Sequence, residues 1–195
     1  MFNSLPRKRV LTERRAPTHR RLVDAATKVV AHRGFHAATV DEIAAEAGFS
    51  VGALYSNFAG KDDLFLAVFD GHVRWFRERL EAAMAASDTR AAVDAWMDGL
   101  TEDPEQLLIF IEFWAYAVRK PKLRRRFAAL MAQFRSEMAE ALASRAQTAG
   151  RELPLPPDTL ALVLLALGRG LAIEQLADPQ AVGDDAADVV AGLVP

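Results

Sequence analysis

Apolar residues recur every three or four positions through most of the chain, which is the spacing of one buried face of an α-helix. No segment shows the alternation of a half-buried strand, so the pattern predicts an all-α protein with about nine helices. The first follows Thr18 and ends at Gly34, and two short helices lie within 39–58. The others are expected at about 61–86, 89–101, 104–119, 122–148, 158–177 and 184–193.

The window 39–58 predicts two short helices joined by a tight turn. Thr39 can cap the first helix, and Glu42 three residues later completes a reciprocal capping box. Gly48 stands where the backbone must reverse, so we expect a positive φ there. Ser50 can cap the second helix. The inward positions at helical spacing are Val40, Ile43, Ala44, Ala47, Leu54 and Phe58.

This arrangement leaves one face of the second short helix exposed. Helix-turn-helix proteins insert such a face into the major groove of DNA. The exposed face is expected to hold Val51, Gly52, Ala53, Tyr55, Ser56 and Asn57. The alternative is an ordinary helical hairpin from an all-α bundle, which the periodicity alone does not exclude.

A wider pattern around this window narrows the choice. It consists of Thr18, Leu22, Ala26, Gly34, Phe35, Thr39, Val40, Ile43, Ala44, Ala47, Gly48, Ser50, Gly52, Leu54, Tyr55, Phe58, Lys61 and Leu64. Together these residues closely resemble the DNA-binding domain of the tetracycline-repressor (TetR) family. The resemblance runs in register over about 50 residues, far more than a lone short motif. It implies a three-helix DNA-binding domain, a two-fold dimer and repression of transcription.

Charge divides the chain into unequal parts. The net charge is −2, but residues 1–61 carry a net +5 and residues 62–195 a net −7. A basic first third is the electrostatic footprint of a protein that meets phosphate at one end. We expect a basic, disordered arm at 1–16, a helix-turn-helix domain at 17–61, and a helical effector-binding and dimerisation domain at 62–195. The arm would follow phosphates or enter a minor groove, and its alternative is a tail that only aids solubility.

Composition excludes several classes of protein. With 195 residues, 51% of them hydrophobic, the chain can bury a real core as one or two small domains. It contains no cysteine, so it has no disulfide, thiol nucleophile or thiolate metal site. By this interpretation no apolar run reaches the length of a membrane span, and the start lacks the apolar stretch of a signal peptide. We therefore expect a cytoplasmic protein without a membrane partner. No catalytic motif stands out, and neither a cofactor nor a metal site is expected.

Three residues are expected to grip DNA phosphates. Tyr55 has a phenol long enough to reach the backbone, as the TetR resemblance implies, and its alternative is a tyrosine packed in the core. Lys61 places an ammonium beside the exposed N–H groups at its own helix start. Thr39 can offer phosphate both its hydroxyl and its backbone N–H. Gly60 stands where the family usually has Ser or Asn, so we expect a looser cap.

Direct reading of bases is expected to be modest. Val51, Gly52 and Ala53 can touch thymine methyl groups but offer no paired hydrogen bonds. Ser56 and Asn57 are candidate polar readers or phosphate contacts, and Ser50 completes the expected interface. DNA shape and the basic arm would then supply much of the specificity.

The C-terminal part carries two further expectations, and each has an alternative. Aromatic and methionine side chains on its predicted helices would line a cavity for a hydrophobic effector. They are Trp96, Phe110, Phe113, Trp114, Met131, Phe134 and Met138. The alternative is a solid core. A glutamate facing that cavity, from Glu112, Glu137 or Glu174, would favour a cationic ligand.

The predicted helix 158–177 is apolar on more than one side, which suggests a second subunit. We expect a two-fold homodimer in which this helix and helix 184–193 of each subunit form a four-helix interface. Small residues would let the partner approach closely. The expected contacts are Ala161, Leu164, Leu165, Gly168 and Ala172. The alternative is a single central core helix.

Three functional hypotheses follow. The first is a repressor that leaves a palindromic operator in double-stranded DNA when a hydrophobic small molecule binds. The second is a DNA-binding dimer with a filled core and no effector. The third is an enzyme or carrier on a helical scaffold, which no motif supports.

Overall fold

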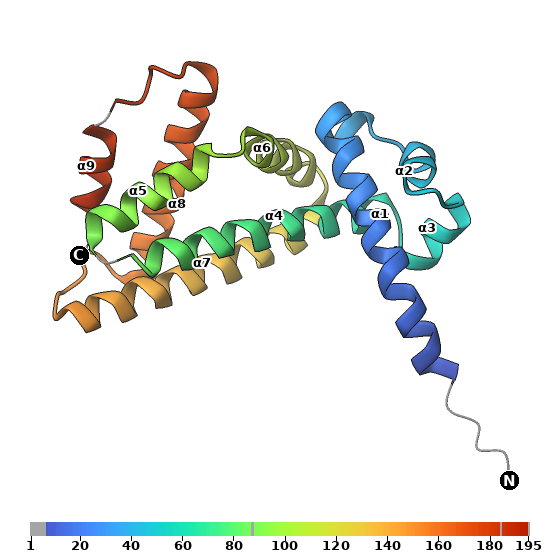
Figure 1. The fold of residues 1–195 in the computed structure, drawn as a ribbon, viewed down its shortest axis with the longest axis horizontal. Coiled ribbons are helices and arrows are strands. Elements are labelled where there is room, and N and C mark those ends of the chain that lie inside the picture. Colours follow the sequence, from blue (N-terminus) through green and yellow to red (C-terminus); the bar gives the residue numbers. More distant parts are fainter. Residues whose placement is uncertain (1–6, 87, 184, 195) are drawn as a thin grey trace, which may run out of the picture.

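The computed structural model describes residues 7–86, 88–183 and 185–194, with the side chains of all of these except 7–15, 100 and 101. The described residues form nine α-helices and no strand (Figure 1). The helices are α1 (Arg7–Ala37), α2 (Val40–Ala47), α3 (Val51–Asn57), α4 (Lys61–Met84), α5 (Thr89–Thr101), α6 (Pro104–Val118), α7 (Pro121–Ala149), α8 (Pro157–Ala177) and α9 (Asp185–Ala191). The prediction of an all-α fold is confirmed.

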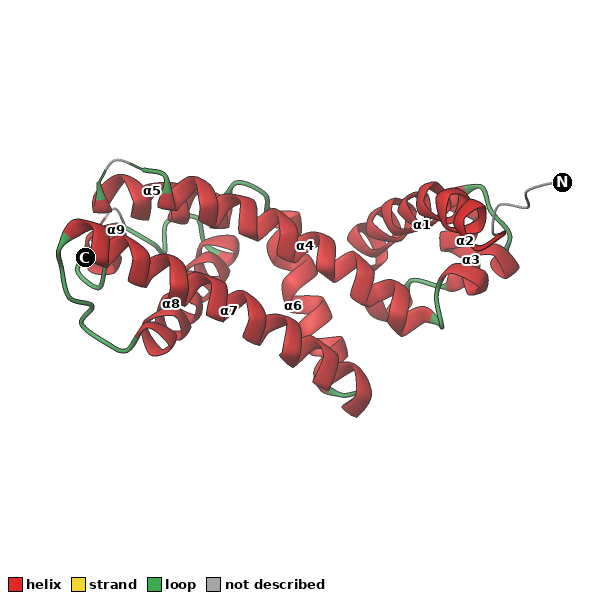
Figure 2. Ribbon diagram, turned by 90° about the horizontal axis from the view of Figure 1, so that it is seen from below, coloured by secondary structure: helices red, strands yellow, loops and turns green. Residues whose placement is uncertain are grey.

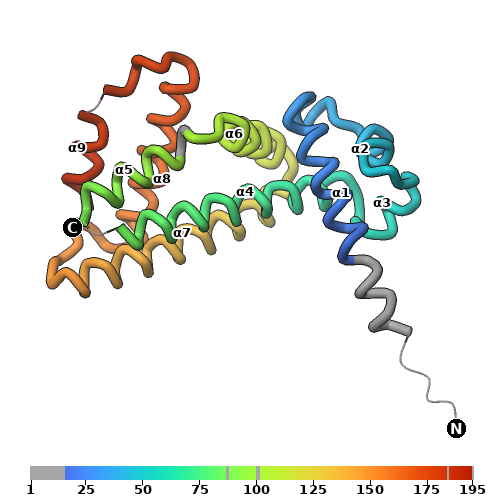
Figure 3. The backbone as a smooth tube through the Cα atoms, in the orientation of Figure 1, coloured from blue at the N-terminus to red at the C-terminus, as the bar shows by residue number. Residues whose placement is uncertain are grey.

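The molecule has a small head and a longer helical body. Helices α1, α2 and α3 pack together as the head at one end (Figures 1 and 2). Helix α4 leaves the head and runs along the body beside α7 (Figure 3). Helices α5, α8 and α9 gather at the far end, whereas α6 lies close to the head and contacts α1, α4 and α7. The body therefore touches the head through more than the connecting helix.

The first helix begins earlier than the sequence pattern predicts. Helix α1 starts at Arg7, within the segment expected to be a disordered arm, and residues 1–6 of that arm lie outside the described residues. Segment 7–16 contains four Arg and one each of Lys, Leu, Glu and Ala, all of which favour helix. Gly34, at φ 72° and ψ 164°, lies outside the helical region, so the regular helix stops where its glycine predicts.

One hydrophobic core runs through both the head and the body. In the head, Leu22 and Ile43 are fully buried. At the junction, the Phe35 ring of α1 lies edge-on to Phe65 of α4 at 4.9 Å and to Phe113 of α6 at 5.2 Å between centroids. Aromatic pairs of this kind contribute about 0.5–1.5 kcal/mol each beyond the area that they bury. The head is thus packed onto the body and not only tethered to it.

Prolines and a glycine set the ends of the body helices. Pro104, Pro121 and Pro157 stand in the first turns of α6, α7 and α8, where a backbone N–H would have no partner in the helix. The Asp103 side chain caps α6 by accepting a hydrogen bond from the backbone N–H two residues later, at 3.1 Å. Gly150 ends α7 at φ 63° and ψ 31°, the left-handed conformation that glycine favours.

Helix α8 is long and apolar enough, by length and composition alone, to cross a membrane. This differs from the expectation that no apolar run reaches that length. Core helices of water-soluble proteins share the property, because a helix buried on several sides must be apolar on several sides. Helix α8 packs against α5, α6 and α7, and it carries Arg169 near its middle. Its composition therefore fits a role inside the body.

Candidate nucleic-acid interface

The turn between α2 and α3 is built as its residues predict. Thr39 Oγ1 accepts a hydrogen bond from Glu42 N at 3.2 Å, and Glu42 Oε2 accepts one from Thr39 N at 3.0 Å. Gly48 takes φ 70° and ψ 33°, the left-handed conformation expected for this reversal. Ser50 Oγ accepts from Ala53 N at 3.2 Å and caps α3. These local bonds fix the angle at which α3 leaves α2.

Helix α3 turns its polar face to solvent. Leu54 and the following Phe58 are buried against the head, whereas Tyr55 is 56% exposed. The alternative of a Tyr55 packed in the core is therefore excluded. Gly52 and Ser56 are also exposed, and Val51, Ala53 and Asn57 are half-buried. This face has the small cross-section and the exposed tyrosine that a major-groove helix needs.

Three polar residues expected to contact DNA already have partners inside the head. Ser56 Oγ and Asn57 Nδ2 both donate to Ala53 O, at 2.7 Å and 2.8 Å. The hydroxyl and the backbone N–H of Thr39 both donate to Glu42 Oε2, at 2.8 Å and 3.0 Å. The Glu42 carboxylate thus accepts the two hydrogen bonds that Thr39 was expected to donate to phosphate. Arg33 forms an ion pair with the same carboxylate. A phosphate contact at Thr39 requires this carboxylate to move aside.

Arg21 supports the turn in a way that the sequence did not reveal. Its Nη2 donates to Ala47 O at 3.0 Å, at the end of α2, where helix carbonyls lack partners. Its guanidinium also lies over the Phe49 ring, 4.7 Å from the centroid. A basic residue on the first helix gives no sequence signal for this role, because the contact joins positions 26 residues apart.

Lys61 lies at the start of α4, as expected, but its ammonium group already has neighbours within the protein. Its Nζ is 3.5 Å from His36 O and 5.1 Å from the centroid of the Phe65 ring. Burial, and then repulsion from Lys120, lower its pKa. Gly60 provides no side-chain cap, which agrees with the looser cap expected there. A phosphate at this helix start would offset the repulsion that Lys61 experiences.

The first turn of α4 is tied to the body by polar side chains. Asp62 Oδ1 accepts hydrogen bonds from the Tyr116 hydroxyl at 2.6 Å and from Lys120 Nζ at 2.7 Å. Burial alone would raise the pKa of Asp62, but the hydrogen bonds from Lys120 and Tyr116, together with the positive charges of Lys120 and Lys61, outweigh it and hold that pKa below its usual value. In the same turn, Arg126 Nη2 of α7 lies 2.8 Å from Asp63 Oδ1. We call Asp62, Tyr116 and Lys120 the junction triad.

A second polar link joins α6 to the end of α1. Glu112 Oε2 accepts a hydrogen bond from Phe35 N at 3.0 Å. A Cβ at Gly34 would collide with the same carboxylate oxygen, so glycine there serves both the positive φ and the close approach of Glu112. Movement of α6 would therefore reach the end of α1, in the head, and the first turn of α4, which directly follows the head.

The residues expected to line an effector cavity fall into two groups. Trp96, Phe113, Phe134 and Met138 are buried in the core, which agrees with the solid-core alternative for them. Phe110 and Met131 are half-buried, and Trp114 is 50% exposed. None of the seven lines any of the five pockets that the structure describes.

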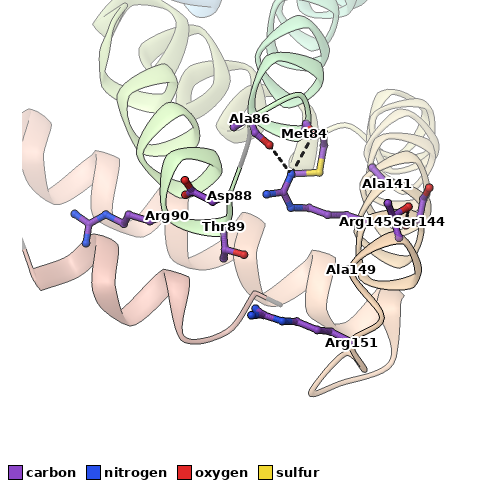
Figure 4. A pocket seen from close by; sticks show the side chains of 11 residues that line it. Met84, Ala86, Asp88, Thr89, Arg90, Ala141, Ser144, Arg145, Ala149 and Arg151 are labelled. Atoms are coloured by element: carbon purple, nitrogen blue, oxygen red, sulfur yellow. Dashed lines mark hydrogen bonds between the residues drawn. The ribbon is translucent and has the colours of Figure 1, made fainter.

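The largest of these pockets is an open cleft of about 950 Å³ at the far end of α4, α5 and α7 (Figure 4). Arg145 lies on one side of it and donates from Nη1 to Met84 O and Ala86 O, both at 3.1 Å. This arginine thereby holds the C-terminal end of α4 against α7. Sequence patterns had not singled out the cleft, because its polar residues are scattered over three helices.

The expected dimer contacts on α8 face the wrong way. Ala161, Leu164, Leu165, Gly168 and Ala172 are all buried inside the protomer. The apolar residues that α8 exposes form a different stripe, and the largest are Leu162, Ile173 and Leu176. Gly170 lies along this stripe, and a Cβ added there would meet open space. The small residues are used to pack α8 into its own domain, not to admit a partner.

The head has three helices and an exposed recognition helix, and it is bonded to a larger helical body. These features define a helix-turn-helix regulator. The chain belongs to the TetR family of bacterial regulatory proteins, whose model matches residues 22–68, and its body matches the C-terminal domain of BetI-type transcriptional repressors over residues 77–193. The family consists of DNA-binding transcriptional regulators and not of enzymes.

Individual relatives resemble the chain to different extents. It is 36% identical to the HTH-type transcriptional activator FasR of Mycolicibacterium smegmatis over 115 residues, which is 56% of this chain and 49% of FasR. It is 29% identical to the HTH-type transcriptional regulator BetI of Brucella melitensis, with 89% of this chain and 85% of BetI covered. The chain thus spans about half of FasR but most of BetI. A solved transcriptional regulator from Rhodococcus sp. Rha1 has a TM-score of 0.70 at 25% identity, with 90% and 95% covered.

Two more distant structures contain ligands of opposite charge. A Saccharomonospora viridis protein in complex with choline has a TM-score of 0.69 at 22% identity, covering 90% of this chain and 94% of that one. FadR of Bacillus subtilis in complex with stearoyl-CoA has a TM-score of 0.65 at 16% identity, covering 89% and 94%. At these identities the likeness shows the shared fold alone. The ligand class of this chain must be argued from its own residues.

Proposed function

We propose that the protein is a homodimeric transcriptional repressor that binds a palindromic operator and leaves it when a hydrophobic small molecule binds the body. The observation that carries this proposal is the exposed α3 face on a head whose position is fixed by side chains of the body. The BetI-type match supports repression, while FasR is an activator, so the direction needs its own test. Its site of action would be the cytoplasm, where bacterial DNA lies.

On DNA, the exposed face of α3 would enter the major groove. The Tyr55 hydroxyl and Lys61 ammonium would contact phosphates, while Val51 and Ala53 would touch thymine methyl groups. Thr39 would add a phosphate contact after Glu42 turns toward Arg33. Because the base-facing side chains are short, DNA shape would carry a large share of the specificity.

Two copies would be joined through the exposed stripe of α8 and through α9. Leu162, Ile173 and Leu176 of α8 are partly solvent-exposed, and Val189 of α9 is 62% exposed. Burial of these side chains against a second copy would remove apolar surface from water, and Ala166 and Gly170 along the stripe would let the helices approach closely. Such a dimer would present two α3 helices to successive major grooves, about 34–36 Å apart.

Release of DNA would be transmitted through the junction triad and the Glu112 link. A ligand that shifts α6 or α7 changes the position of Tyr116 and Lys120, which hold the first turn of α4. It also moves Glu112, which holds the end of α1. A preference of a few kcal/mol for the shifted form is enough to reverse the population of DNA-competent dimers.

A second function has support from packing. Four of the seven expected cavity residues belong to the buried core. A DNA-binding dimer without an effector would need no opening in the body. The two functions differ in one measurement, because only the first predicts a compound that lowers the affinity for the operator.

The first experiment selects bound fragments from a genomic library with the full-length protein, and a palindromic consensus is expected. Binding to the selected duplex is then measured over a range of salt concentrations. Lys61→Ala is expected to weaken binding and to reduce the salt slope by about one phosphate contact, roughly 0.9 on the log–log scale. Arg151→Ala is the matched control, because Arg151 is an exposed cation at the far end of the body.

Several results would contradict the proposal. One is the absence of salt-dependent binding to any selected duplex. Another is the recovery of unrelated single half-sites only, which would remove the dimer. An unchanged salt slope in Lys61→Ala would remove the assigned role of Lys61. Screening compounds for release of the bound operator then separates the repressor with an effector from the one without.

A further inference from the structure

Arg169 of α8 is half-buried, and its described neighbours are unusual surroundings for a permanent charge. Its guanidinium carbon is 4.3 Å from the centroid of the Phe110 ring, and its Nη2 is 3.8 Å from the sulfur of Met131. Both neighbours are half-buried apolar side chains, from α6 and α7. Buried arginines are normally paired with a carboxylate, because their desolvation is otherwise uncompensated.

No carboxylate lies within salt-bridge distance of Arg169 among the residues that the structure describes. The neighbouring charge that affects it is another cation, Arg135 of α7. Burial, and then Arg135, lower the pKa of Arg169 to about 10, so the guanidinium keeps its charge at neutral pH. The charge that acts on Arg169 is therefore that of a second arginine, and neither arginine belongs to an ion pair among the described residues.

The three glutamates that the sequence suggests as candidates near the aromatic stripes have other partners or are exposed. Glu112 holds the backbone N–H of Phe35, and Glu137 forms a bidentate pair with Arg77 at 2.7 Å and 3.1 Å. Glu174 is exposed on α8. No described contact therefore places any of these glutamates beside Phe110 and Met131, so the condition for a cationic ligand is not supported here. The charge beside Phe110 and Met131 is positive.

Apolar and cationic groups from three helices converge at this place. Trp114 follows Phe110 by one turn on α6, and Arg135 follows Met131 by one turn on α7, so each pair shares a helix face. Trp114 is half-exposed, so part of its ring surface on this helix face is free to contact a ligand. The same region contains His72, whose ring centroid is 6.0 Å from that of Phe110.

We propose that Arg169, with Arg135, binds the anionic head group of the effector, a carboxylate or a phosphate, while Phe110, Met131 and Trp114 contact its apolar part. This inference rests on the proposed function and names the ligand class: an amphipathic organic anion. The anion would replace the missing carboxylate partner of Arg169 and accept charge-assisted hydrogen bonds from its planar donors. A quaternary ammonium would be repelled by the same two charges.

The test uses full-length protein and three probes with the same alkyl chain, dodecanoate, dodecyl phosphate and dodecyltrimethylammonium, together with choline. Binding is measured by isothermal titration calorimetry. The wild type is expected to bind at least one of the two anions about tenfold or more tightly than the alkylammonium, because charge-assisted hydrogen bonds are lost with the cation. The ratio of the two anions tells whether carboxylate or phosphate is the preferred head group.

Three variants separate binding from packing. Arg169→Met is expected to lose about tenfold or more in affinity for the anion and to change little toward the alkylammonium. Arg169→Lys should keep part of the affinity, because it retains the charge but not the planar donors. Arg125→Met is the matched control, since Arg125 is an exposed arginine on the same helix as Arg135. It should bind as the wild type does.

The melting temperature of the ligand-free variants is a second measurement. A ligand-binding Arg169 and a purely structural Arg169 predict opposite changes in it. Arg169→Met is expected to melt at the same temperature as the wild type or higher, because a half-buried charge without a carboxylate partner is removed. If Arg169 served only to stack on Phe110, the variant would melt lower and anion affinity would stay unchanged. Should Arg169→Met fail to fold, Arg135→Met gives the test, with weaker anion binding expected.

Failure of this inference is distinguishable from failure of the proposed function. Equal anion affinity in Arg169→Met and wild type, preference for the alkylammonium, or no binding of any probe would overturn the anionic site. Operator binding by the ligand-free protein is measured separately by fluorescence anisotropy. If the operator is still bound and a neutral or cationic compound releases it, the repressor function stands and only the ligand class is wrong.

Discussion

The head and the body satisfy their internal polar groups in different ways. In the α2–α3 turn, each cap comes from a residue three positions away, as between Thr39 and Glu42. In the body, His72 reaches a partner 34 residues away, and Arg169 has no carboxylate partner among the described residues. Most polar groups of the turn are thus satisfied by near neighbours, with Arg21 as the long-range exception, whereas the body depends on partners that are distant in sequence. The recognition surface therefore depends mainly on local bonds, and the body depends on long-range packing.

The largest effect is expected where the two regions share a core. Phe113 is fully buried and lies against Phe35 of the head and against Phe69 and Phe127 of the body. Phe113→Ala should lower the free energy of unfolding by about 3–5 kcal/mol, because it removes a large side chain and leaves a cavity. Urea unfolding followed by circular dichroism measures this loss.

The same experiment asks whether the head and the body unfold together. Because the core is continuous, a single transition is expected in both the wild type and Phe113→Ala. Leu155→Ala is the control, since Leu155 is a partly exposed residue in the loop before α8 and should change stability by less than about 0.5 kcal/mol. Two separate transitions in the wild type would show that the head is an independent unit.

A buried histidine makes the body sensitive to acid. Burial is the main cause that lowers the pKa of His72 from 6.5 to about 4, and the charge of Arg169 adds to it, while the hydrogen bond with Gln106 opposes both. In the unfolded chain His72 would take up a proton near pH 6.5, whereas the folded protein resists protonation until about pH 4. Stability contributed by neutral His72 is thus present above pH 6.5 and is lost as the pH falls toward 4, by about 3 kcal/mol in all.

Urea unfolding at several pH values between 7 and 4 measures that slope, and two variants assign it. His72→Leu should flatten the curve, because leucine does not titrate. His32→Gln should leave the curve unchanged, since His32 is exposed. A slope that persists in His72→Leu would place the acid sensitivity elsewhere, for example in the carboxylates of the junction.

A smaller effect is expected where the body holds the head. Tyr116→Phe removes the hydroxyl that donates to Asp62 and leaves the ring in place. We expect a loss of about 1 kcal/mol in stability, typical of one hydrogen bond. If the junction triad transmits the ligand signal, the variant should also need more ligand to release the operator. A double-mutant cycle with Asp62→Asn isolates the pair, and purely additive losses would show that the two residues are not coupled.

The head was predictable from sequence because its geometry is decided by neighbouring residues. The capping box at Thr39, the positive φ at Gly48 and the exposure of Tyr55 each follow from residue types within a few positions of one another. The contacts that were missed are long-range. Arg21 and Glu112 reach partners 26 and 77 residues away, and no local pattern marks such a pair.

The sequence predicted the helices of the body, but it did not predict which face of each helix is buried in the protomer and which is exposed. Helix α8 is apolar on several sides, so its periodicity cannot tell which side meets its own domain and which meets solvent. The small residues Ala161, Gly168 and Ala172 turned out to allow close packing within the protomer. For the effector residues, an aromatic stripe looks the same whether it lines a cavity or fills a core. Arg169 gave no signal, because a lone arginine in a helix is ordinarily exposed.

The smallest effect is expected at the start of α4, where the helix has no side-chain cap. Gly60 is the N-cap residue, with extended backbone at φ 160° and ψ −177° and no side-chain cap. Gly60→Ser would supply a hydroxyl to a free N–H of the first turn and should stabilise the protein by a few tenths of a kcal/mol, roughly 1 °C in melting temperature. A Cβ there meets no atom within 4 Å, so steric strain does not oppose the gain. Gly60→Ala is the matched control: it adds the Cβ without the hydroxyl, and an equal gain would assign the effect to the reduced freedom of the unfolded chain instead of the cap.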